Sequence, residues 1–228
     1  RRVLGLLDLT SLEANDTEAS IAAMCARARE TAATVTVEGA DALVPYPAAV
    51  CVFGPFVRTA REQLRDTPVR VATVANFPAG GEDVEAVEGE VQAARAAGAH
   101  EVDVVLPYRA LIRGDMNAVK SVLRVARLAA GSVTLKVIVE SGVLAPDDLD
   151  RACRISLDEG ADFLKTSTGK VPTGATPVAL STMLSAALAA GRPVGVKVSG
   201  GVRSLDQART YLDIADRLAG AAWVSSRT

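Results

Sequence analysis

Histidine is nearly absent from this 228-residue sequence, which contains only His100. A single histidine excludes a histidine-rich metal site and argues against a Ser-His-Asp triad. Aromatic residues make up only 4% of the chain, so the core must be built from Ala, Val and Leu. The three cysteines, Cys25, Cys51 and Cys153, are odd in number and show no CxxC spacing. Reduced thiols of a cytoplasmic protein fit this pattern best.

The sequence also lacks any long apolar run and any excess of charge of one sign. The formal net charge is −2, with acidic and basic residues interspersed. This balance gives no footprint for nucleic acid and no polybasic patch for a membrane surface. No run is long enough to cross a bilayer, and Asp8 interrupts the first apolar stretch, which argues against a signal peptide. We therefore expect a cytoplasmic protein that acts on a small molecule.

Short apolar runs alternate with amphipathic helical patterns along the whole chain, which predicts seven strand–helix pairs and a parallel sheet. A (β/α)₈ barrel and a doubly wound open sheet both fit, although no GxGxxG follows the first strand as a dinucleotide fold requires. The predicted strands are residues 6–10, 49–53, 70–75, 101–106, 133–140, 162–166 and 194–199. The predicted helices are residues 17–31, 56–65, 83–97, 116–130, 146–159, 177–190 and 205–218.

Lysine is scarce, with five residues against twenty arginines, and three of the five lie within predicted strands. Side chains alternate between the two faces of a strand, so one face of a closed barrel lines its interior. On this parity Lys136, Lys165, Lys197 and Asp103 all point inward from four consecutive strands. They would meet near the carboxyl-terminal mouth, where the active sites of barrel enzymes lie.

Lysines gathered in this way could supply an amine nucleophile. Two ammonium groups about 4 Å apart repel by roughly 4 kcal/mol at an effective dielectric near 20. That energy equals about three pKa units, enough to leave one amine partly neutral at pH 7. A neutral amine attacks an aldehyde or ketone to form a Schiff base, and Asp103 could move protons directly or through a water.

Glycines follow two of these strands, at Gly169 and at Gly200-Gly201. Free N–H groups in such loops can cradle a phosphate, and the helix predicted to begin near Ser204 would add its positive end. A plain turn is the alternative. The Gly169-Lys170 pair does not form a P-loop, because the earlier glycine and the following Ser or Thr are missing.

Several sequence segments resemble those of the deoxyribose-phosphate aldolase family. They occur in the same order as in the family and extend over nearly the whole chain. The most specific are residues 163–170, FLKTSTGK, and 196–203, VKVSGGVR, while residues 103–110, 7–10, 74–78 and 135–140 support them. The resemblance implies a single TIM-barrel domain over residues 1–228, acting as a class I aldolase that needs no metal or cofactor. It would interconvert 2-deoxyribose 5-phosphate with acetaldehyde and glyceraldehyde 3-phosphate.

The resemblance also implies roles for individual residues. Lys165 matches the lysine that forms the Schiff base, Lys197 the lysine that lowers the pKa of the nucleophile, and Asp103 the acid–base residue. The residues that match the phosphate loops are Gly169, Lys170, Gly200 and Gly201. The residues that match positions near the barrel mouth are Asp8, Thr10, Cys51 and Lys136, although Cys51 could equally be a small buried strand residue.

The sequence departs from the family in one respect. Only seven strand–helix pairs are present, whereas the family has an eighth strand, a further phosphate loop and a last helix. We therefore expect the native protein to be longer, and a homodimer is possible. Two other functions stay open: another Schiff-base barrel enzyme, such as a transaldolase-like aldolase, and a truncated, noncatalytic binder of sugar phosphates.

Overall fold

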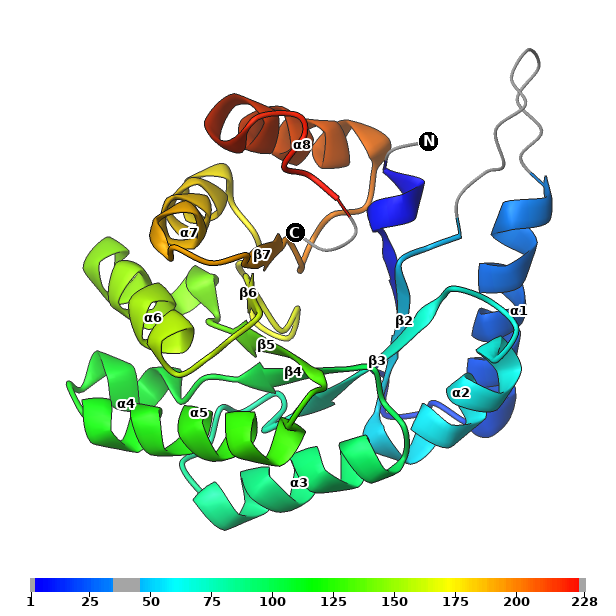
Figure 1. Ribbon diagram of the computed structural model, residues 1–228, viewed down its shortest axis with the longest axis horizontal. Coiled ribbons are helices and arrows are strands. Elements are labelled where there is room, and N and C mark those ends of the chain that lie inside the picture. The colour runs from blue at the N-terminus through cyan, green and yellow to red at the C-terminus, as the bar shows by residue number, and fades with distance from the viewer. Residues whose placement is uncertain (1–2, 35–45, 226–228) are drawn as a thin grey trace.

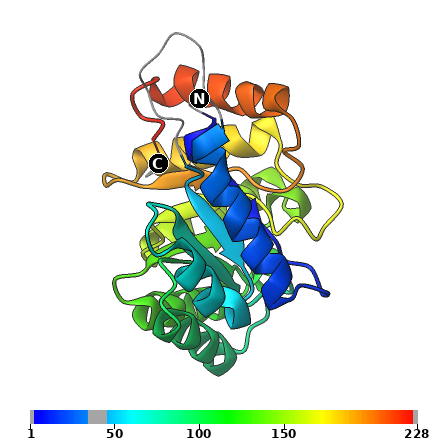
Figure 2. The same ribbon diagram turned by 90° about the vertical axis from the view of Figure 1, so that its right-hand side faces the viewer.

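Seven parallel strands form one curled sheet in the order β1 to β7, with the helices packed around its outer face (Figures 1 and 2). This computed structural model describes residues 3–34 and 46–225. The strands are β1 (Asp8–Thr10), β2 (Ala49–Val52), β3 (Arg70–Ala75), β4 (Glu101–Val105), β5 (Thr134–Ile138), β6 (Phe163–Lys165) and β7 (Gly195–Lys197). The predicted alternation is confirmed, and the architecture is a TIM barrel without its eighth strand in the described ranges.

All the helices except α4 lie close to their predicted positions. They are α1 (Glu18–Thr34), α2 (Val57–Leu64), α3 (Val84–Ala96), α4 (Tyr108–Ile112), α5 (Met116–Ala130), α6 (Pro146–Asp158), α7 (Pro177–Ala189) and α8 (Leu205–Ala219). Three short 3₁₀ helices are Leu4–Leu6, Gly54–Phe56 and Ser141–Val143. The sequence did not predict α4, because five residues are too few to show a helical period. The capping box Ser204–Gln207 begins α8, as its sequence indicates.

Side chains on the outer face of the sheet pack against the helices and form the hydrophobic core. Side chains on the inner face point into the barrel. In β2, Val50 and Val52 are fully buried against the helices, in a core cluster that also contains residues of β3, β4 and β5. The inward positions of the sheet carry the charged residues Asp103, Lys136 and Lys165, each no more than 4% exposed. Burial of so many charges indicates that they pair with one another.

Along the described chain, β1 and β7 are the two edges of the sheet, because each pairs with only one neighbouring strand. An ion pair between Asp8 on β1 and Lys197 on β7 bridges these edges. A cavity of about 1690 Å³ opens between them and runs to the mouth of the barrel. The inward lysines Lys136, Lys165 and Lys197 line this cavity.

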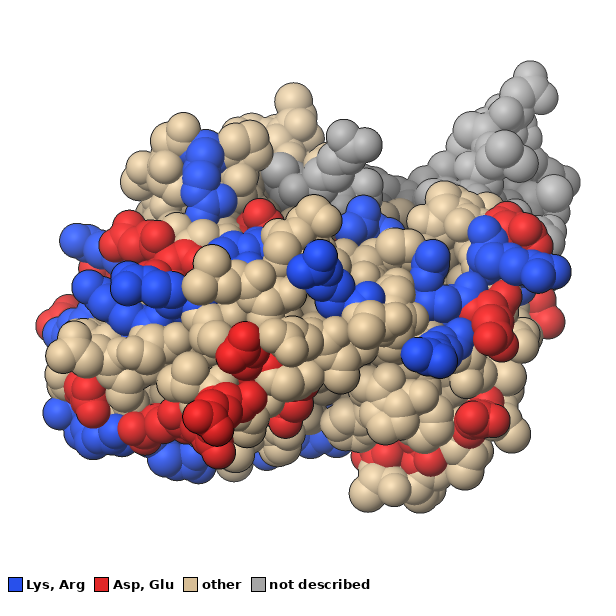
Figure 3. Space-filling model, turned by 60° about the horizontal axis from the view of Figure 1, so that its bottom comes forward, with Lys and Arg blue, Asp and Glu red and all other residues tan. Residues whose placement is uncertain are grey.

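The surface mixes charges of both signs. On the face that Figure 3 shows, Lys and Arg side chains lie among Asp and Glu, with uncharged areas between them. No helix within residues 3–34 and 46–225 combines the length and the apolar character needed to span a membrane.

Arginines join neighbouring helices at the amino-terminal end of the barrel. Each of three arginines donates to a carbonyl at or just beyond the C-terminal end of the next helix around the barrel, where main-chain carbonyls lack helical partners. We call these contacts the arginine clasps. They join Arg29 to the Gln63 carbonyl at 2.7 Å, Arg95 to the Ala129 carbonyl at 3.4 Å, and Arg127 to the Gly160 carbonyl at 3.4 Å.

Replacing Arg127 with Ala should destabilise the fold. Its side chain is only 22% exposed and also donates to the carbonyls of Gly131 and Val133 and to the Asp162 carboxylate, at 2.6, 2.8 and 2.8 Å. We expect a loss of about 1–3 kcal/mol in the free energy of unfolding, measured with urea. Arg209→Ala is the control, because Arg209 is 71% exposed and has a 3.5 Å contact with Asp206. Equal losses in the two variants would contradict a structural role for the clasp.

Candidate active site

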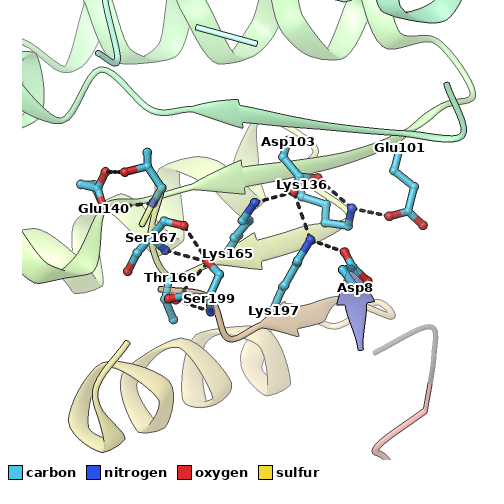
Figure 4. Close-up of polar contacts among 11 residues, drawn as sticks. Asp8, Glu101, Asp103, Lys136, Glu140, Lys165, Thr166, Ser167, Lys197 and Ser199 are labelled. Carbon is cyan, nitrogen blue, oxygen red and sulfur yellow. Dashed lines mark hydrogen bonds and ion pairs between the residues drawn. The ribbon is translucent and has the colours of Figure 1, made fainter. Parts of the chain in front are cut away.

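The Asp103 carboxylate is the centre of the polar cluster inside the barrel (Figure 4). It is completely buried and faces three ammonium groups. Oδ1 accepts a hydrogen bond from Lys136 at 2.7 Å, and Oδ2 accepts from Lys165 at 2.7 Å and from Lys197 at 3.3 Å. The structure thus brings together the four residues that strand parity predicts to converge.

Strand register explains this convergence. Asp103 on β4 lies opposite Lys136 on β5, and Lys165 on β6 lies opposite Lys197 on β7. Opposed residues of parallel strands point to the same face, so each pair projects inward at one level. Lys165 and Lys197 are the last residues of their strands, which places them at the mouth.

Two further carboxylates complete the charge balance. Asp8 forms an ion pair with Lys197, and Glu101 forms one with Lys136. Three ammonium groups therefore face three carboxylates. We did not predict Glu101 as a site residue, although its position two residues before Asp103 places it on the same inward face. Glu101 also pairs with Arg70 at 2.5 Å, which links the cluster to the amino-terminal end of the barrel.

These contacts fix the protonation of most of the cluster. Burial opposes ionisation of Asp103, but Lys136, Lys165 and Lys197 outweigh it and hold its pKa well below the usual 3.8. Burial likewise disfavours the charged form of Lys197, yet Asp103 and Asp8 hold its pKa well above the usual 10.5. The pKa of Lys136 is also raised, against burial, mainly by Asp103. At neutral pH Asp103 is ionised and Lys197 is an ammonium ion.

Lys165 differs from the other two lysines in its partners. Lys136 has Glu101 and Asp103, and Lys197 has Asp8 and Asp103. Within the described part of the chain, Lys165 pairs with Asp103 alone. Its nitrogen shares Oδ2 with that of Lys197, so the two nitrogens are at most about 6 Å apart, a distance at which the charges repel by ~3 kcal/mol. Lys165 is therefore the lysine with the least carboxylate support.

Hydrogen bonds from the Thr166 and Ser199 side chains stabilise the backbone just after Lys165 and Lys197. Thr166 Oγ1 donates to the Ser199 carbonyl at 2.8 Å and accepts from the Ser199 N–H at 2.9 Å. Ser199 Oγ in turn donates to the Ser167 carbonyl at 2.6 Å and accepts from the Ser167 N–H at 3.2 Å. These bonds continue the pairing of β6 and β7 past their last residues, and so fix the backbone from which Lys165 and Lys197 project.

Glycines let the two loops at the mouth pack backbone to backbone. Gly169, Gly200 and Gly201 have φ values of +78°, +82° and +97°, a region that favours glycine. A Cβ on Gly174 would lie 2.0 Å from the Gly200 carbonyl oxygen, so no larger residue fits there without a shift of the loop. Gly169, Gly200 and Gly201 line the cavity, while Lys170 pairs with Glu13 at 3.2 Å.

The remaining predicted residues take different positions. Asp8 and Thr10, on the edge strand β1, both line the cavity. Cys51, which lies opposite Thr10, is completely buried and packs with Leu12 and Ala72. Burial raises the pKa of its thiol, although Lys165 opposes the shift. This placement favours the alternative that Cys51 is a buried strand residue.

Comparison with known proteins agrees with the arrangement of the barrel. The sequence model of DeoC/LacD family aldolases matches residues 3–225. Among solved structures, a Coccidioides immitis protein provisionally assigned as a deoxyribose-phosphate aldolase is 31% identical. The match covers 97% of this chain and 83% of that one, with a TM-score of 0.85.

Two further structures share the fold. An aldolase designated QR15 is 28% identical over 93% of this chain and 87% of that one, with a TM-score of 0.81. The tetrameric deoxyribose phosphate aldolase of Aeropyrum pernix is 24% identical over 93% of this chain and 83% of that one, with a TM-score of 0.72. Since the family model spans nearly the whole chain, the chain belongs to the DeoC/LacD family of aldolases.

Proposed function

We propose that this aldolase interconverts 2-deoxyribose 5-phosphate with acetaldehyde and glyceraldehyde 3-phosphate through a Schiff base on Lys165. The assignment to Lys165 rests on the number of carboxylates that each of the three buried lysines contacts. Two are each held by a pair of carboxylates, whereas Lys165, at the end of β6, pairs with one among the residues that the structure describes. Lys165 is thus the lysine whose ammonium group has the fewest carboxylate partners, at the mouth where a substrate can reach it.

The first half of the reaction joins the substrate to the enzyme. The Lys165 ammonium releases a proton, and the neutral amine attacks the C1 aldehyde carbon of the open-chain sugar to form a carbinolamine. The carbinolamine oxygen takes up a proton and leaves as water, which gives a protonated imine. The positive charge of this imine next to C2 prepares the neighbouring carbon–carbon bond for cleavage.

The second half breaks that bond. A base removes the proton of the C3 hydroxyl, the C3 carbonyl forms, and the C2–C3 bond electrons move into the imine to give an enamine. Glyceraldehyde 3-phosphate departs. The enamine then takes a proton at C2, and one water hydrolyses the resulting imine to release acetaldehyde and the free amine. The water released on imine formation balances the water consumed here.

We assign the proton steps from the contacts around Lys165. Asp103 touches the Lys165 nitrogen, so it is placed to receive protons, yet the three lysines hold its pKa so low that it cannot keep one. We therefore assign Asp103 a transient role, passing protons directly or through a water between Lys165 and the reacting carbons. Lys197 stays charged and stabilises negative charge that develops beside it.

The phosphate end of the substrate fits the glycine loops. Gly169 follows Lys165 by four residues, and Gly200 and Gly201 follow Lys197 by three and four. These glycines line the same cavity as both lysines. A substrate bound covalently at Lys165 can therefore extend its phosphate toward N–H donors at the mouth. A cytoplasmic location and a homodimer stay predictions.

Borohydride reduction in the presence of acetaldehyde should add an ethyl group to Lys165, because reduction makes the imine permanent. Peptide mapping by mass spectrometry locates the adduct. Lys165→Met should abolish both adduct and turnover, whereas Lys120→Met, at an exposed position on α5, should retain both. An adduct mainly on Lys136 or Lys197 would contradict the assignment. Dihydroxyacetone as a better donor than acetaldehyde would favour a different Schiff-base aldolase.

Lys197→Met should shift adduct formation to higher pH. The substitution removes the permanent cation beside Lys165 and leaves Asp8 and Asp103 less neutralised, so both effects help Lys165 to keep its proton. We expect the rate of trapping at pH 7 to fall about tenfold or more. The measurement is the trapping rate across pH with Lys120→Met as control. An unshifted profile in the Lys197 variant would contradict the electrostatic role.

A further inference from the structure

We propose that Glu140 is a positioning residue for phosphate recognition, and that it acts through Thr168 on the loop that presents Gly169 and Lys170. The inference rests on the proposed function in assigning this loop to the phosphate end of the substrate. Glu140 lies outside the cluster around Asp103, and no step of the reaction described above uses it. Its carboxylate is nevertheless completely buried at the mouth of the barrel.

The backbone of Glu140 is held in an unusual conformation. It follows β5 by two residues and has a φ of +56°, in the left-handed region that residues other than glycine rarely adopt. Such a conformation persists only where surrounding contacts determine it. The conformation directs the side chain to the neighbouring loop between β6 and α7 (Figure 4).

Both carboxylate oxygens of Glu140 accept hydrogen bonds from Thr168. Glu140 Oε1 accepts from the Thr168 main-chain N–H at 3.1 Å, and Oε2 accepts from the Thr168 hydroxyl at 2.6 Å. Hydrogen bonds to an ionised acceptor are stronger than neutral ones. The pair of contacts fixes both the backbone and the side-chain rotamer of Thr168.

Thr168 passes this constraint to Lys170. Because the hydroxyl proton of Thr168 points to Glu140, the lone pairs of Oγ1 are free to accept, and one receives the Lys170 main-chain N–H at 3.0 Å. A hydrogen-bonded path therefore runs from Glu140 through Thr168 to Lys170. Gly169 lies inside this path and cannot change conformation without breaking it.

Close backbone contacts also connect the three loops at the mouth that follow β5, β6 and β7. A Cβ on Gly142, two residues after Glu140, would lie only 1.9 Å from the Thr173 carbonyl oxygen. The Ala175 N–H donates to the Gly200 carbonyl at 3.0 Å. The loops that follow β5, β6 and β7 thus pack in series, and Glu140 anchors the first to the second. We expect loss of its carboxylate to loosen the phosphate end and to leave Lys165 in place.

The test compares Glu140→Gln with wild type by two readouts on the full chain. One is the dissociation constant for inorganic phosphate, measured by calorimetry. The other is the rate of borohydride trapping with acetaldehyde, which has no phosphate. We expect phosphate affinity to fall about tenfold, with a matching rise in KM for the sugar phosphate, and trapping to stay within about twofold of wild type.

Glu159→Gln is the matched control. Its carboxylate is also largely buried and accepts two hydrogen bonds from Arg124, but it lies at the C-terminal end of α6, before β6 begins, and so at the end of the barrel opposite the mouth. This variant should keep the phosphate affinity of wild type. An equal loss of affinity in both glutamine variants would overturn the proposal.

A second variant keeps the proposal testable if Glu140→Gln does not fold. Thr168→Val removes the hydroxyl at the other end of the contact and should also weaken phosphate binding. The double variant should bind phosphate no more weakly than the weaker single variant, because both changes break one path. Wild-type affinity in Thr168→Val, additive losses, or no phosphate binding by wild type would overturn the proposal. Absence of a wild-type adduct on Lys165 would instead overturn the catalytic function.

Discussion

The ion pairs of Asp103 are the constraint on which the interior of this barrel depends. A charge moved from water into a protein interior is costly unless partners compensate it. Three lysines and three acids enter together, and Asp103 is the one member that contacts all three ammonium groups. Its loss would leave Lys165 without a carboxylate partner within residues 3–34 and 46–225, and Lys136 and Lys197 with one carboxylate partner fewer. In the proposed mechanism, the contacts that compensate these buried charges also determine which lysine reacts.

The unequal use of lysine and arginine follows from this division of the molecule. Arginine stays charged at all accessible pH and offers several donors in a fixed plane, which suits the helix-end carbonyls of the arginine clasps. Lysine can give up its proton when its surroundings allow, which suits a nucleophile. Arginine therefore joins helices at the amino-terminal end, while Lys136, Lys165 and Lys197 occupy the interior. Under the proposed mechanism, the two residue types therefore have two different chemical roles.

Sequence reasoning placed the elements and the inward lysines, because both follow from local periodicity. It could not give the partners of each charge, since these depend on register between strands far apart in the chain. Glu101 shows the limit: its face was evident from Asp103, yet its pairing with Lys136 needed the alignment of β4 and β5. Glu140 was beyond reach, because a left-handed backbone after β5 directs its side chain in a way that strand alternation does not describe.

The electrostatic role of Lys197 is tested most directly by its protonation state, measured by NMR of the ¹⁵N-labelled lysine side chains, with Lys197→Met to assign the signal. We expect the Lys197 nitrogen to remain an ammonium ion from about pH 6 to about pH 10, because Asp8 and Asp103 hold its pKa well above 10.5. Loss of the Lys197 proton within that range would show that the two carboxylates do not stabilise its ammonium form. It would contradict the electrostatic argument for Lys165 as the nucleophile.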